Sequence, residues 1–343
     1  MDIFNVLFVA PFLDMADSPV FFAEVVISGG LTGVMYSLVA LGFVLIFKAS
    51  GVFNFAQGAM VLFAALTLVG LMERGVPVLL ALIVTAMVMV LLAMLIERMM
   101  LRHLINQEGI ILFMATIGLD FLLQGVGQIA WGSNVKVLDV GIPNQSFEVA
   151  GILLNQFDLF AAGTGAVLVT GLAVFFQKTT IGRALRAVAD DHQAALSVGI
   201  PLKTIWVIVW SVAGIVALVA GIMWGAKSGV QFSLSLIALK ALPVLILGGF
   251  TSVPGAIIGG LIIGVGEKIA EIYWGPLFGG AIDSWPDAVG FLMQSGDAWL
   301  RACAVYSLKG ARERGEFRDQ VSRLRRDPDP VVRESADLVL PYV

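Results

Sequence analysis

Eight long apolar stretches are the feature that most limits what this chain can fold into. They lie at residues 22–47, 57–72, 77–97, 109–131, 157–176, 204–226, 235–251 and 254–274. A helix needs about 20 apolar residues to cross a hydrocarbon core about 30 Å thick. The whole chain is 59% apolar and only 13% charged, which excludes a soluble enzyme, a nucleic-acid-binding protein and a disordered chain. We therefore expect an all-α, polytopic membrane protein with about eight transmembrane helices.

The charges of the connecting loops predict the orientation of these helices. The loops after the first, third and fifth stretches carry Lys48, Arg98, Arg102, Lys178, Arg183, Arg186 and Lys203. The loops after the second, fourth and sixth stretches carry only Arg74, Lys136 and Lys227. Cytoplasmic loops are the more basic ones, so the first set is predicted to be cytoplasmic. Residues 1–21 are then an extracytoplasmic segment, and their apolar run at 3–13 is too short to span and fits an interfacial position.

Two segments place polar, glycine or proline residues where a helix should continue. Asn54 and Gln57 lie between the first two stretches, in a segment that stays half apolar. Gly248 and Gly249 follow Pro243 near the end of the seventh stretch. Interrupted helices at membrane depth occur where they are buried in protein or line a water-filled route. Ordinary interfacial turns and close helix packing would produce the same patterns.

Two ionisable residues inside the stretches are further candidates for the substrate path. Asp120 lies in the middle of the fourth stretch, and Lys240 lies near one end of the seventh. Charges inside a membrane are costly and tend to be paired. Lys240 is close enough to the stretch end to extend toward the outer interface, which is the simpler interpretation. A hydrogen-bonded structural role would likewise explain Asp120.

The loop at 177–203 is predicted to form an amphipathic cytoplasmic helix. Its apolar positions are Ala184, Leu185, Val188, Ala195 and Leu196, and its polar positions include Arg183, Arg186, Asp190 and Asp191. Gly199 and Pro201 are placed to end this helix. Its apolar face needs a partner, which is the chain's own body, the membrane surface or a docked soluble subunit.

Catalytic chemistry is not expected. The chain lacks the glycine-rich phosphate loop with its lysine, and it has no Ser/His/Asp or Cys/His grouping. Its two histidines, His103 and His192, are too far apart in sequence to suggest a metal site, and the single Cys303 cannot form a disulfide within the chain. We expect no cofactor, no metal and no nucleic acid to bind this chain.

Three blocks together resemble the inner-membrane permease subunits of bacterial ABC importers for branched-chain amino acids. The blocks are residues 36–57, 182–199 and 239–260, and the resemblance covers roughly residues 22–292. Within the second block, residues 193–199 resemble the importer coupling-helix pattern Glu-Ala-Ala-x-x-x-Gly, with glutamine in place of glutamate. The coupling residues implied by this resemblance are Gly182, Arg183, Arg186, Asp190, Gln193, Ala194, Ala195 and Gly199.

The resemblance implies partners and a mechanism. Two permease subunits would form the path, cytoplasmic ATPases would dock on helix 182–199, and a periplasmic binding protein would deliver the substrate. ATP would be used only by the partner subunits. By resemblance, Asn54, Gln57, Gly248 and Gly249 would lie near the path. The alternatives are an importer of urea or short amides with the same architecture, and a self-contained secondary transporter or channel that would use Asp120 and Lys240 as its charges.

Residues 293–343 do not follow the pattern of this family. They carry nine basic and eight acidic residues and resemble a fragment of HEAT-type helical repeats. Asp297–Arg301 and Asp329–Arg333 recur 32 residues apart, each at the start of a predicted amphipathic helix. An even number of spans would leave this tail outside, whereas a ninth span near 285–308 would bring it to the cytoplasm at the cost of burying Asp297 and Arg301.

Overall fold

The computed structural model describes residues 9–51, 53–104, 107–143, 145–149, 151–190, 195, 197–275, 293, 301, 305 and 318–340. These residues form two compact units, Pro19–Lys268 and a second made of residues before 19 and after 268. The helices of the larger unit are α2 (Pro19–Ser50), α3 (Gln57–Glu73), α4 (Val78–Met99), η2 (Leu101–His103), α5 (Gly109–Trp131), α6 (Gln156–Lys178), α7 (Thr180–Asp190), α9 (Leu202–Ser228), η3 (Phe232–Leu236), α10 (Ile237–Gly248) and α11 (Val253–Ile269). Its strands are β1 (Ser146–Val149) and β2 (Ile152–Asn155).

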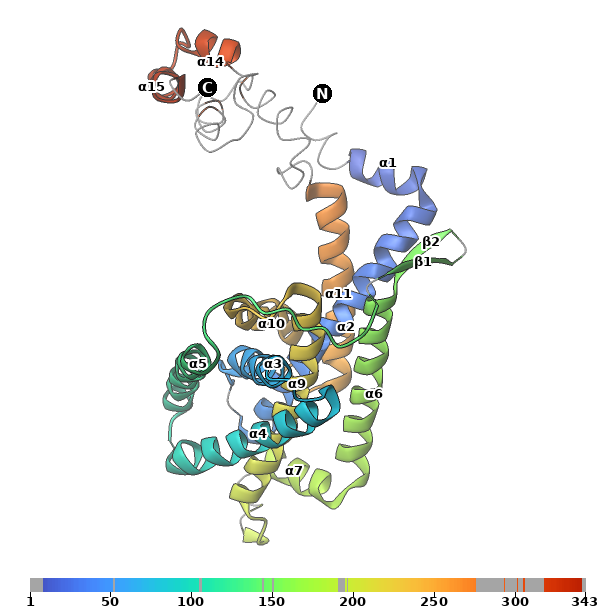
Figure 1. Ribbon diagram of the computed structural model, residues 1–343, viewed down its shortest axis with the longest axis vertical. Helices are drawn as coiled ribbons and strands as arrows, with labels where there is room; N and C mark the ends of the chain where they lie inside the picture. The colour runs from blue at the N-terminus through green and yellow to red at the C-terminus, as the bar shows by residue number, and fades with distance from the viewer. Residues whose placement is uncertain are drawn as a thin grey trace. The chain divides into compact units, whose positions relative to one another are not determined.

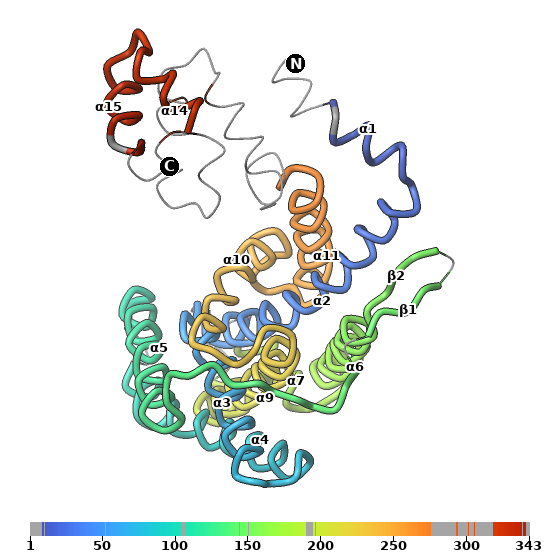
Figure 2. The backbone as a smooth tube through the Cα atoms, turned by 45° about the horizontal axis from the view of Figure 1, so that its top comes forward, coloured from blue at the N-terminus to red at the C-terminus, as the bar shows by residue number. Residues whose placement is uncertain are grey.

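The larger unit is a helical bundle built around α2, α3 and α9 (Figures 1 and 2). α9 packs against α2, α3 and α4, while α5 packs on α3 and α6 packs on α2. α3, α9 and the second half of α2 are mostly buried, whereas α4, α5, α6 and α11 expose large apolar side chains. Apolar helices that expose their outward faces are suited to contact with lipid rather than with water.

Each of the eight predicted apolar stretches is helical, which confirms the all-α membrane architecture. Among the described residues, six helices are long and apolar enough to cross a membrane: Pro19–Ser50, Val78–His103, Gly109–Trp131, Gln156–Lys178, Leu202–Ser228 and Val253–Trp274. Gln57–Glu73 and Phe232–Gly248 are apolar but shorter. That these two also cross, giving eight spans, stays a prediction.

α2 and α11 pack with their backbones almost in contact. The glycines at this contact are Gly29 and Gly33 of α2 and Gly260 and Gly264 of α11. A Cβ atom added to Gly33 would lie only 2.3 Å from the carbonyl oxygen of Gly260. The hydroxyl of Ser37 lies 2.9 Å from the carbonyl oxygen of Gly33 within α2 and 3.1 Å from that of Ala256 across the same contact, so its single hydrogen is shared between the two acceptors. Small residues with spacing of four allow this approach, as is common between membrane helices.

A short β-hairpin precedes α6, which the sequence analysis did not predict. β1 and β2 pair antiparallel, with Ser146 opposite Asn155. The carboxylate of Glu24 on α2 accepts a hydrogen bond from the backbone N–H of Leu153, at 3.1 Å. The side chain of Asn155 accepts from the N–H of Phe157 and thereby caps α6, at 2.8 Å.

The smaller unit contains α1 (Ala10–Asp17), η4 (Ala270–Trp274), α14 (Arg318–Leu324) and α15 (Pro330–Val339). Within it, the rings of Phe12 and Trp274 meet edge to face, with their centroids 5.8 Å apart. α1 is a short helix in the region predicted to be interfacial. The apolar start at 285–293 and the ninth span considered near 285–308 lie outside the described residues, apart from Met293, Arg301 and Val305.

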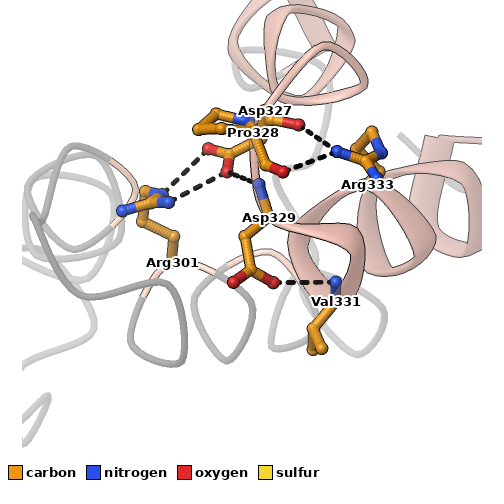
Figure 3. Close-up of polar contacts among 6 residues, drawn as sticks. All are labelled: Arg301, Asp327, Pro328, Asp329, Val331 and Arg333. Carbon is orange, nitrogen blue, oxygen red and sulfur yellow. Dashed lines mark hydrogen bonds and ion pairs between the residues drawn. The ribbon is translucent and has the colours of Figure 1, made fainter.

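The helix predicted to begin after Asp329 is present as α15. The Asp329 carboxylate accepts from the N–H of Val331 at 2.9 Å (Figure 3). Pro330 occupies the first turn. Just before this cap, Asp327 receives two hydrogen bonds of 2.9 Å from the guanidinium of Arg301. This arrangement holds the pKa of the Asp327 carboxyl below its ordinary value. Arg333, which is 32 residues after Arg301, donates instead to the Asp327 carbonyl oxygen at 2.6 Å.

Candidate translocation site and coupling element

The chain between α2 and α3 is a buried break in the helical structure. Residues 51 and 53–56 are not helical, as the polar residues there predict. Thr116 of α5 contacts the backbone of this segment. Its hydroxyl accepts from the N–H of Phe55 at 3.2 Å and lies 3.4 Å from the carbonyl oxygen of Phe53. The side chain of Asn54 accepts from the N–H of Ala56 at 3.1 Å. Polar backbone groups at this depth therefore find partners inside the protein.

Asn54 and Gln57 are both completely buried in this chain. Asn54 borders a cavity of only about 10 Å³, which is the scale of one water molecule. Gln57 begins α3 and lies against Gly42 of α2, where a Cβ atom would come within 1.9 Å of its Nε2. Neither polar atom of the Gln57 side chain has a hydrogen-bond partner among the described residues. The role of both residues at a substrate path stays a prediction.

Asp120 lies beside a larger cavity of about 250 Å³ between α2, α5 and the segment before α10. The aromatic residues that line it are Phe43, Phe53, Phe55 and Phe121. Its polar groups include Asp120 and Gln124, whose side-chain amide donates to the Asp120 carboxylate at 2.7 Å. The cavity, referred to below as the aromatic cavity, thus combines a mostly apolar wall with one carboxylate.

Lys240 is joined to an acid and a tyrosine on two other helices. Its ammonium group lies 2.7 Å from Glu267 of α11 and 3.3 Å from the hydroxyl of Tyr36 of α2. The ring of Tyr36 stacks on Trp224 of α9, with centroids 5.2 Å apart. The sequence did not predict this pairing, because 27 residues and a turn separate the partners.

Gly248 and Gly249 form a tight turn between α10 and α11. A Cβ atom on Gly248 would lie 2.2 Å from the carbonyl oxygen of Gly255, and one on Gly255 would lie 1.8 Å from that of Gly248. Gly249 has φ +86°, a conformation that favours glycine. Neither glycine borders the aromatic cavity, and a direct substrate contact by either stays a prediction.

α7 is fastened to the last turn of α6 by three residues. Thr179 donates to the carbonyl oxygen of Phe175 at 2.6 Å and accepts from the N–H of Gly182 at 3.0 Å. Arg186 donates to the carbonyl oxygen of Phe176 at 2.6 Å. A Cβ atom on Gly182 would lie 2.2 Å from that same oxygen, so the corner between the helices requires glycine.

The apolar face of α7 packs within the chain's own body. Leu185 and Val188 are buried in the main core, and α7 contacts α2, α6 and α9. Arg183 is exposed on the other side. Of the partners considered for the apolar face, the structure therefore shows the chain itself, while the polar face is open to a second protein.

The predicted end of this helical region is also present. Ala195 is buried, Gly199 has φ +83°, and the N–H of Ile200 donates to the Ala195 carbonyl oxygen at 3.0 Å. This pattern is a glycine-based helix end. Gln193 and Ala194 lie outside the described residues, as do the side-chain surroundings of Asp190.

The predicted path residues therefore fall into four places rather than one. Asn54 and Gln57 are in the core, Asp120 is at the aromatic cavity, Lys240 is in an ion pair, and the two glycines are at a helix turn. Phe43, Phe53, Phe55 and Phe121 were not predicted as site residues. Aromatic residues inside apolar stretches carry no signal of their own, because ordinary core packing uses the same residues.

The comparisons with known proteins agree with this architecture. The family described as branched-chain amino acid transport system, permease component, matches residues 25–290. The high-affinity branched-chain amino acid transport system permease protein BraD of Pseudomonas aeruginosa is 27% identical over 285 residues, covering 79% of this chain and 91% of BraD. The corresponding permease LivH of Escherichia coli K12 is 27% identical, covering 76% of this chain and 89% of LivH.

A third relative has a higher identity over a shorter part of the chain. The probable branched-chain amino acid transport permease LivH of Methanocaldococcus jannaschii is 31% identical, covering 71% of this chain and 79% of that protein. No solved structure matches the chain significantly. The chain therefore belongs to the family of permease components of branched-chain amino acid transport systems, and it is a multi-pass inner-membrane transport protein.

Proposed function

We propose that this chain is the permease subunit of an ATP-driven importer that moves branched-chain or related small amino acids across the inner membrane. ATP hydrolysis takes place on separate cytoplasmic ATPase subunits, and this chain binds no cofactor. A second permease subunit and a periplasmic substrate-binding protein complete the importer. Family membership supports this assembly, and the relatives' names support the substrate class.

The observation that carries the coupling step is the fastening of α7 to α6. Arg186, Thr179 and Gly182 attach the short helix to the last turn of a long apolar helix. The buried side chains of Leu185 and Val188 attach it to the core as well. A force applied by an ATPase to the exposed face of α7 would therefore move α6 and the core with it, rather than bend a loose loop.

The aromatic cavity supports an amphipathic substrate of small size. Its phenylalanine side chains offer apolar surface to a branched aliphatic side chain, and Asp120 offers a counter-charge to an ammonium group. Gln124 holds the Asp120 carboxylate by a hydrogen bond of 2.7 Å, so the acid is oriented before a substrate arrives.

The decisive experiment reconstitutes the chain with its partner permease, ATPases and binding protein in proteoliposomes. Uptake of labelled leucine is measured with and without ATP, and with and without ion gradients. ATP-dependent leucine uptake supports the proposal. Uptake driven by a proton or sodium gradient alone would identify a secondary transporter, and uptake of urea with no uptake of leucine, isoleucine or valine would move the substrate to the amide class.

Coupling through α7 is tested by reversing a charge on its exposed face. Arg183→Glu is expected to reduce co-purification of the ATPases and ATP-dependent uptake together. Glu148→Arg, an exposed charge reversal on β1, is the matched control and is expected to retain both. Normal ATPase binding and uptake in the Arg183→Glu protein would contradict docking on this helix.

A further inference from the structure

A second cavity of about 330 Å³ lies where α2, α6, α7 and the start of α11 meet. Its polar lining includes Lys48, Arg186, Gln177 and Ser252, and its apolar lining includes Ala173 and Ile257. It shares no lining residue with the aromatic cavity. The transport path proposed above therefore makes no use of it.

The two cations of this cavity have no acidic partner among the described residues. Lys48 is in the last turn of α2 and is half-buried, as is Arg186 of α7. Arg186 uses one donor on the carbonyl oxygen of Phe176, and a guanidinium has five donors. Two partly desolvated cations facing one cavity favour an anion there, because each raises the cost of burying the other.

Three lysines elsewhere in the larger unit have acidic partners. Lys136 pairs with Glu73, Lys227 pairs with Asp158 at 2.7 Å, and Lys240 pairs with Glu267. These three lysines lie in or next to segments predicted to be extracytoplasmic, whereas Lys48 and Arg186 lie in segments predicted to be cytoplasmic. Lys48 and Arg186 therefore differ from these three lysines, because they line one cavity together and neither has an acidic partner among the described residues.

The walls of the cavity are apolar and belong to helices that face lipid. Leu45, Val169, Ala173 and Ile257 contribute aliphatic surface beside the polar groups. The wall helices α6 and α11 also expose Val174 and Ile258, at 48% and 59%. A soluble anion would leave this aliphatic surface uncovered, whereas a lipid would cover it with hydrocarbon and place its charge at the helix ends.

We propose that this cavity binds an anionic phospholipid. The headgroup phosphate lies between the Lys48 ammonium and the Arg186 guanidinium, and Ser252 and Gln177 supply further polar contacts. An acyl chain lies along Ala173 and Ile257. Basic pockets between membrane helices at the cytoplasmic side are suited to acidic headgroups, and here the basic and apolar parts belong to one cavity.

Native mass spectrometry of the full-length protein in detergent tests the assignment. The protein is titrated with dioleoyl phosphatidylglycerol and, separately, with dioleoyl phosphatidylcholine. Wild type is expected to bind the anionic lipid preferentially. Lys48→Gln is expected to lower its affinity about fivefold, the effect of one cation near an anionic headgroup. Arg98→Gln removes an exposed cation at the end of α4, outside the cavity, and is the matched control.

A second variant tests the apolar part without changing the charge. Ala173→Trp fills the wall of the cavity and is expected to weaken phosphatidylglycerol binding while a monodisperse protein is retained. Equal binding of the two lipids by wild type would overturn the proposal, as would an unchanged lipid preference in Lys48→Gln. Displacement of the lipid by excess inorganic phosphate would show an anion site that does not need the acyl chain, which also contradicts it.

Discussion

Replacing Gly33 by alanine tests whether the close contact between α2 and α11 stabilises the bundle. The new Cβ atom would lie 2.3 Å from the Gly260 carbonyl oxygen, and real Cβ atoms come no closer than about 3.0 Å to such atoms. The helices must therefore separate locally by about 0.7 Å. A gap of about 0.5–1 Å removes a quarter to a half of the dispersion attraction across a contact.

The same separation weakens the hydrogen bond between helices. The Ser37 hydroxyl is 3.1 Å from the Ala256 carbonyl oxygen, so a shift of this size takes it beyond hydrogen-bond distance. Overpacking costs about 1–3 kcal/mol, and a hydrogen bond between membrane helices contributes about 0.6 kcal/mol on average. We expect Gly33→Ala to lower the free energy of unfolding by about 2 kcal/mol.

Thermal unfolding in detergent, followed by size-exclusion chromatography of the heated protein, measures this loss. Gly30→Ala and Gly266→Ala are matched controls on the same two helices. A Cβ atom on Gly30 meets nothing closer than 3.9 Å, and one on Gly266 meets nothing within 4 Å. Both controls are expected to unfold at or above the wild-type temperature, since alanine favours helix over glycine. If Gly33→Ala unfolds at the same temperature as Gly30→Ala, the packing argument is refuted.

Three further predictions concern charged groups. Lys240→Glu and Glu267→Lys are each expected to reduce transport. The double exchange is expected to recover part of it, because the ion pair, 2.7 Å in wild type, is restored with its charges reversed. Uptake into proteoliposomes measures this recovery, and a double variant no better than the single variants would contradict the prediction. Asp120→Asn is expected to raise the KM for leucine more than it lowers kcat, and an unchanged KM would remove the acid from the substrate site. Arg301 lowers the pKa of the Asp327 carboxyl in the folded state. The ionised carboxylate therefore stabilises the fold at pH values above the ordinary carboxyl pKa, and this stabilisation is lost as the pH falls through the lowered pKa of the folded state. Limited proteolysis should cleave the tail of the wild-type protein faster at acid pH than at neutral pH. In Asp327→Asn, the rate of cleavage should not change over the same pH range.

The sequence was informative wherever a property repeats along the chain. Apolar runs predicted the helices, because a bilayer demands about 20 such residues in succession. The periodic face of 184–196 predicted α7, and Gly199 predicted the helix end found after Ser197. The recurrence of Asp297–Arg301 at Asp329–Arg333 predicted the start of α15, which the Asp329 side chain caps.

Contacts between distant segments were not predictable in this way. The pairing of Lys240 with Glu267, the attachment of Arg186 to Phe176 and the contact of Thr116 with residues 53 and 55 depend on how helices pack. Nor did the sequence distinguish a polar residue that faces a route from one enclosed in the core. Asn54 and Gln57 illustrate this, since both are fully buried in the chain.

α10 and α11 are connected at both ends. Together they form a rigid pair of helices, called here the α10–α11 frame. At the turn, the backbones of Gly248 and Gly255 touch, so the two helices cannot fold further toward each other. Toward the other ends, the ion pair of Lys240 with Glu267 ties the first turn of α10 to the far part of α11. Two helices that are held together at both ends move as one unit. Opening and closing during transport must then take place at the joints between this frame and the surrounding helices, and the distance between α10 and α11 should be constant throughout the cycle.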